Sequence, residues 1–163
     1  MTVCPEIYAI EYNQNRVAPK DLRIPRLGLV AAHTLAKLMA NVTASLTKIP
    51  ISNVHYWSDS TTALHWLRHK GTWSVFVRNR VNKIQELTKN SQWRHVPTQI
   101  NPSDLGTRGI SPNKIGNLWL KGPEYLSRPD DWPAQPEITS TADTNQEQVG
   151  PKVNTMMIKM LFK

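Results

Sequence analysis

The chain of 163 residues has a single cysteine, Cys4, so no disulfide can form within it, and a reducing environment is expected. No uninterrupted apolar run approaches the roughly 18 residues that a membrane-spanning helix needs. The longest candidate, residues 27–39, is broken four times by glycine or polar side chains. The first residues also lack the basic and apolar regions of a signal peptide. We therefore expect an intracellular protein with no membrane partner and room for one folded core.

Acidic residues are scarce in the middle of the chain. Residues 22–123 contain 14 Lys or Arg but only three acids, Asp59, Glu86 and Asp104, whereas the two ends together carry a small excess of acids. This +11 segment favours a polyanionic partner. A basic surface kept for solubility is the alternative that charge alone leaves open. The few acids retained here are therefore candidates for a specific role.

Strand and helix signals alternate along the first hundred residues. We expect strands over residues 7–12, 51–57 and 92–96, where β-branched and aromatic residues lie between turn signals. Three helices are expected between them: one starting at Pro25, one capped near Ser60 and running to about His69, and one capped by Ser74. A fourth helical turn is expected at Ser103. This order predicts an α/β fold with helices packed on a small sheet.

Apolar spacing defines the expected core faces of the two longer helices. In the first, the spacing of three and four predicts a buried stripe of Leu27, Ala31, Leu35, Leu38, Val42 and Leu46. In the third, the stripe is Val77, Val81, Ile84 and Leu87. Residues 133–152 are polar and rich in Pro, Gln, Thr and Ser, so we expect the segment 127–163 to be a disordered linker and tail after a domain at 1–126.

Two acids occupy positions suited to chemistry. Asp59 follows the expected second strand, and ligands of open α/β sheets usually bind beyond strand ends. Asp104 opens the last helical turn. Each could simply cap its helix. Together, in a strongly basic segment, they would suit a divalent cation that faces a phosphodiester.

A series of short motifs resembles the ribonuclease H-like domain of BEL/Pao-type retrotransposon polyproteins. The central landmarks are Trp57-Ser58-Asp59-Ser60 and the run from Asn101 to Gly109. The others, in chain order, are residues 16–19, 24–27, 76–81, 93–97 and 119–123. The resemblance implies a ribonuclease H-like fold with a small mixed sheet, in a domain that lies between reverse transcriptase and integrase segments.

The resemblance also implies an activity and a ligand set. Such domains cut the RNA strand of an RNA–DNA hybrid with two Mg²⁺ or Mn²⁺ ions held by four carboxylates. Asp59 and Asp104 match two of these acids. The helix acid falls at Gly28, and the first acid belongs to a strand that would precede residue 7. We therefore expect an N-terminally truncated domain that lacks its first strands and two metal ligands, and that has lost cleavage.

The alternative is a non-catalytic nucleic-acid-binding or interdomain module. Its expected contacts are the basic residues Arg78, Arg80, Lys83, Arg94 and Arg108. Four tryptophans, at positions 57, 66, 73 and 93, are expected to be mainly core residues, although aromatic rings can stack on bases. His65 and His69 have the one-face spacing of helical metal ligands, but with no neighbouring acid or cysteine pair we interpret them as surface or half-buried histidines.

Overall fold

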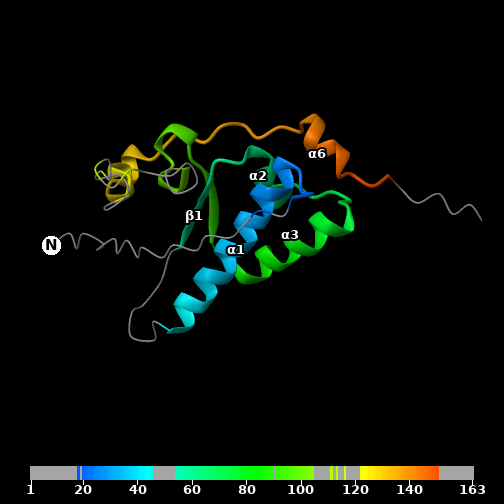
Figure 1. Ribbon diagram of the computed structural model, residues 1–163, viewed down its shortest axis with the longest axis horizontal. Helices are drawn as coiled ribbons and strands as arrows, with labels where there is room; N and C mark the ends of the chain where they lie inside the picture. Colours follow the sequence, from blue (N-terminus) through cyan, green and yellow to red (C-terminus); the bar gives the residue numbers. More distant parts are fainter. Residues whose placement is uncertain are drawn as a thin grey trace, which may run out of the picture.

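The computed structural model describes residues 20–45, 54–89, 91–104 and 122–150, together with residues 18, 111, 113 and 116. Its sheet consists of two parallel strands, β1 (His55–Ser58) and β2 (Gln92–His95), in which His55 pairs with Gln92 and Ser58 with His95. Parallel strands require a crossover connection. Here α2 (Thr61–Arg68) and α3 (Val75–Leu87) provide it (Figure 1). The α/β class is thus confirmed. The expected strand at 7–12 lies outside the described residues. A mixed sheet also needs an antiparallel strand, and the described residues pair only two parallel strands.

The helices α2 and α3 begin and end close to where the sequence predicts. Ser60 caps α2, because its Oγ accepts a hydrogen bond of 3.2 Å from the Ala63 amide. The predicted stripe of α3 is buried through Val77, Val81 and Ile84. Ser74 stands at the start of α3, but its side chain makes no capping bond because it donates to Glu147 instead.

The helix α1 (Ile24–Ser45) has the predicted start but buries a different face. Leu29, Ala32 and Ala36 are buried with Val42, whereas Ala31 and Leu35 of the predicted stripe are exposed. Small alanines on this face allow α1 to approach α3, which lies alongside it (Figure 1). By length and composition α1 could also cross a membrane, contrary to our count of apolar runs. Core helices of soluble proteins pass the same test when mostly buried, whereas 22% of the apolar window of α1 is buried in the described structure. Leu29, Ala32 and Ala36 belong to the core.

The core lies where α1, α2 and α3 meet. Trp66 is fully buried there, and Trp73 is nearly so, which agrees with the expectation that most tryptophans serve packing. Trp93 is only partly buried and stacks on Tyr56 of the neighbouring strand at 4.7 Å. Trp57 makes edge contacts with Tyr125 and Trp132, so the segment after residue 122 covers that side of the sheet.

The segment 133–150, here called the C-terminal strap, is ordered in contrast to the expected disorder. The strap follows two short turns, η3 (Glu124–Ser127) and η4 (Pro129–Asp131). It crosses α2 and contains α6 (Ala142–Gln146) near its end (Figure 1). Ile138, Thr144 and Glu147 are buried. The strap is polar, and it is held by hydrogen bonds and ion pairs in place of a large apolar face. The domain boundary placed after residue 126 therefore separates segments that pack together in the described structure.

Candidate functional site

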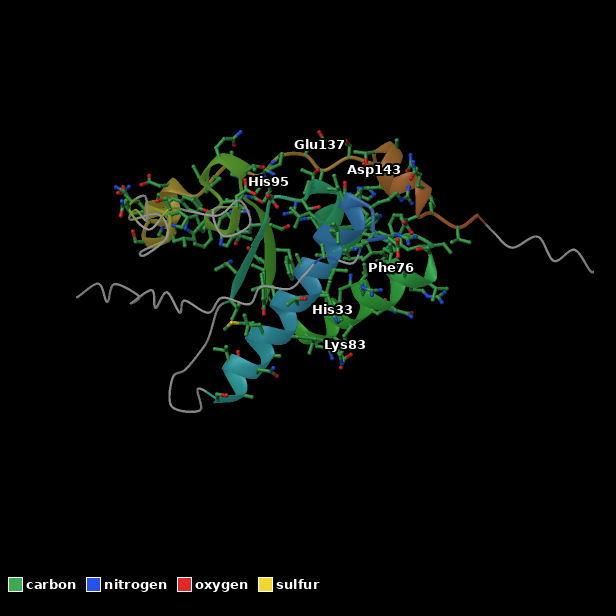
Figure 2. All side chains as sticks on the ribbon, viewed as in Figure 1. His33, Phe76, Lys83, His95, Glu137 and Asp143 are labelled. Carbon is green, nitrogen blue, oxygen red and sulfur yellow. The ribbon has the colours of Figure 1, made fainter. Side chains whose placement is uncertain are left out.

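Asp59 lies directly between β1 and the N-terminus of α2. It borders an open hollow of about 560 Å³, whose other sides come from the start of α1, the first turn of α2, and α6. The lining includes Arg23 and Pro25 of the first segment and Asp143 of the strap, which Figure 2 labels on α6. Asp59 is therefore half-exposed at a strand end, as predicted, beside one further carboxylate and one arginine.

Gly28 faces this site from α1. A Cβ atom added at Gly28 would lie 2.6 Å from Ser60 Oγ and 2.9 Å from Ser60 Cβ, distances too short for real atoms. Ser60 is held in place by its role as the cap of α2. The helix position that resemblance associates with a metal ligand is thus close to Asp59 in space, and its glycine allows α1 to pack tightly on the start of α2.

Asp104 occupies a separate helical turn formed by residues 102–104. Asn101 starts this turn: its side-chain oxygen accepts from the Ser103 amide, and its carbonyl accepts from the Asp104 amide, each at 3.2 Å. The residues that line the Asp59 hollow do not include Asp104. Within the described ranges, no three His, Cys, Asp or Glu side chains come together as a metal site. The described donor set therefore does not fit a pair of Mg²⁺ or Mn²⁺ ions.

A buried carboxylate that sequence reasoning missed lies near the start of α1. Glu147 of the strap is 3% exposed and accepts two hydrogen bonds from Arg26, at 2.6 and 3.0 Å. Arg23 adds an ion pair at 3.4 Å, and Ser74 Oγ donates to the same carboxylate. The bonds from Arg26 are the main reason that the pKa of Glu147 lies below its ordinary value. These four residues, the Glu147 cluster, join α1, α3 and the strap.

No pattern in the sequence could have identified the Glu147 cluster. Glu147 lies 121 residues from Arg26 along the chain, in a polar stretch without hydrophobic periodicity. The only local signal nearby is Thr141, which forms a capping box with Thr144 at the start of α6. That signal marks a helix start and not the ion pair.

The described basic residues among those proposed to bind nucleic acid come from two elements, α3 and β2. Arg78 is exposed on α3, but Arg80 stacks on the Phe76 ring at 3.6 Å, and Lys83 pairs with Glu86 at 2.9 Å. Figure 2 labels Phe76 and Lys83 on α3. Arg94 lies instead on β2, over the rings of Trp57 and Trp132. Arg108 lies outside the described residues.

The two histidines of α2 pack on each other. The rings of His65 and His69 are stacked with centroids 4.3 Å apart, and His69 Nδ1 is 3.2 Å from the His65 carbonyl. Burial is the main reason that the pKa of His65 is lowered, and the charge of His69 adds to it. The interpretation as surface or half-buried histidines is thus wrong for His65, which is buried, and correct for His69, which is exposed.

Comparison with known proteins places part of the chain. The family model of the Pao retrotransposon-like RNaseH-like domain matches residues 8–60. This range contains α1, β1, Gly28 and Asp59, and it confirms the resemblance inferred from the motifs. Asp104 lies beyond the matched range. Searches of curated proteins and of solved structures found no match.

Proposed function

Because residues 8–60 match the family model of the Pao retrotransposon-like RNaseH-like domain, we propose that this chain is a polyprotein segment that binds nucleic acid without cutting it. Its ligand would be an RNA–DNA hybrid or a related nucleic acid inside the cell. Reverse transcriptase and integrase segments of the same polyprotein are the partners that the family suggests.

The loss of cleavage rests mainly on Gly28. Two-metal hydrolysis needs a set of carboxylates that hold two cations and stabilise the attacking and leaving oxygens. At Gly28 the chain lacks a side chain, and Ser60 occupies the space into which one would extend. The other carboxylate in the Asp59 hollow, Asp143, shares the lining with Arg23, whose positive charge opposes cation binding. Asp59 and Asp104 are then remnants of a ligand set and not a working centre.

Retained binding is supported by charge. The middle segment carries +11, and each arginine or lysine that contacts a phosphate releases condensed counterions. Arg78 is exposed on α3 and free to make such contacts in the described structure, whereas Arg80 and Lys83 already have partners within the chain. We therefore expect modest, salt-sensitive affinity with little sequence preference.

The cleavage test uses a labelled RNA–DNA hybrid with Mg²⁺ and then Mn²⁺. The parent chain and Asp59→Asn should both leave the hybrid intact, while circular dichroism confirms that both are folded. Cleavage by the parent that disappears in Asp59→Asn would show that a working metal centre exists and would refute the proposal.

The binding test measures fluorescence anisotropy of the same hybrid between 50 and 200 mM salt. These two concentrations bracket a range over which several phosphate contacts change affinity by orders of magnitude. We expect the logarithm of affinity to fall linearly with the logarithm of salt concentration. An absence of binding at 50 mM salt would exclude the nucleic-acid role.

A further inference from the structure

A second hollow lies at the end of the fold away from Asp59. It has a volume of about 480 Å³ and is formed by the ends of α2 and α3, the first part of β2, and the strap. Its polar lining consists of Arg68, Gln85, Thr88, Ser91, Gln92, Arg94 and Gln135. Asp59 precedes α2 and Arg68 ends it, and this helix of eight residues is about 12 Å long. No described residue lines both hollows.

Two arginines and no acid line this hollow. Arg68 donates from Nη2 to the Trp93 carbonyl at 2.7 Å and to Gln135 Oε1 at 3.3 Å, contacts that hold its guanidinium at the edge of β2. Burial, and then the nearby positive charge of Arg94, lower the pKa of Arg68. The two guanidinium groups therefore repel each other, and no carboxylate among the residues that line the hollow balances their charge.

Arg94 has unused hydrogen-bonding capacity. Its Nη1 donates to Gln92 Oε1 at 3.3 Å, and its guanidinium carbon lies 5.5 Å from the Trp57 ring centroid and 4.8 Å from the Trp132 ring centroid. Its Nε is buried and has no hydrogen-bond partner in the described structure. Buried polar groups without partners are uncommon and call for an explanation. An oxyanion between the two arginines would reduce their repulsion. The neutral side chains of Ser91, Gln92 and Gln85 line the same hollow, and Gln85 Nε2 already donates to the Leu67 carbonyl at 3.1 Å.

We propose that the hollow between Arg68 and Arg94 is a phosphate-binding site that takes a backbone phosphate of the bound nucleic acid. This inference rests on the proposed function for the identity of the ligand. A phosphate is favoured over an acidic peptide because guanidinium forks and several neutral donors converge on one small space, whereas an acidic peptide would require charges spread along a surface.

The first experiment compares hybrid binding by the parent, Arg68→Gln, and the control Lys37→Gln, which removes one positive charge from an exposed position on α1. Arg68→Gln should weaken binding about tenfold at 50 mM salt and reduce the salt slope by about one. Lys37→Gln should change affinity less than twofold. Arg94→Lys keeps the charge but loses the fork, and it should weaken binding in the same direction. Thermal unfolding of each variant verifies folding.

The second experiment separates this site from the proposed function. Inorganic phosphate, added alone, should raise the melting temperature of the parent and not that of Arg68→Gln. Equal salt slopes for Arg68→Gln and Lys37→Gln would overturn the site while leaving nucleic-acid binding intact. If the parent fails to bind hybrid, the proposed function fails, and the ligand assigned to the hollow fails with it. Displacement of hybrid by polyglutamate but not by phosphate would overturn the site in favour of an acidic protein partner.

Discussion

The Glu147 cluster makes the most direct test of the structure, through the substitution Glu147→Gln. The carboxylate is 3% exposed, whereas Arg26 and Arg23 are 30% and 56% exposed. Breaking a fully buried ion pair costs roughly 3–5 kcal/mol, and exposed pairs contribute about 0–1 kcal/mol. Because only the carboxylate is deeply buried, we expect a loss of about 2 kcal/mol at pH 7. For a chain of this size that loss lowers the melting temperature by roughly 4–8 °C.

The effect of Glu147→Gln should depend on pH. Because the folded-state pKa of Glu147 lies below its unfolded value of about 4.3, the cluster contributes fully above that value. The contribution is lost as the pH falls through the lower folded-state pKa. The difference in melting temperature between parent and variant, followed by circular dichroism from pH 7 to pH 3, should therefore shrink below about pH 4.

Glu86→Gln provides the matched control. It removes the same charge from an ion pair with Lys83 in which the side chains are 60% and 44% exposed. That change should cost about 0.5 kcal/mol or less. Equal melting temperatures for Glu147→Gln and Glu86→Gln at pH 7, or a difference that persists unchanged to pH 3, would refute the assignment of the strap to this buried position.

Three further substitutions test the packing around the site and the strap. Gly28→Ala should destabilise the chain by about 1–3 kcal/mol in chemical denaturation, because its Cβ meets Ser60, although alanine has the better helix propensity. The loss should be smaller in a Ser60→Gly background, and additive effects of the two substitutions would contradict this contact. Trp66→Ala should cost about 3–5 kcal/mol, since Trp66 is fully buried, and a loss below about 1 kcal/mol would show that α2 does not carry the core. The His95 amide donates to Gln135 Oε1 at 2.7 Å. Gln135→Ala should therefore lower the free energy of unfolding by about 1–2 kcal/mol and speed hydrogen exchange at that amide. Unchanged exchange would place the strap elsewhere.

Local signals in the sequence were sufficient for α2 and α3. Ser60 caps α2, and the stripe of Val77, Val81 and Ile84 is buried, because capping and amphipathic spacing act within a few residues of chain. The position of Asp59 at a strand end also followed from sequence, since the strand before it and the cap after it are both local features.

The buried face of α1 could not be read correctly from the sequence. Its apolar residues cover most of the helix surface, so periodicity alone does not select one stripe. The packing of α3 selects the side with Ala32 and Ala36, because small side chains let the two helices approach. Leu35 has the larger apolar side chain but remains on the exposed side.

The sequence by itself determined the starts of α1, α2 and α3, the α/β class and the family resemblance, because each depends on short motifs or on periodic patterns. Tertiary structure alone decided that the strap is ordered, that the Glu147 cluster forms, and that Gly28 lies against Ser60. These features join residues that are distant along the chain, through polar contacts or close approach. Hydrogen bonds and ion pairs of this kind have no period, so only the folded chain shows which polar residues meet.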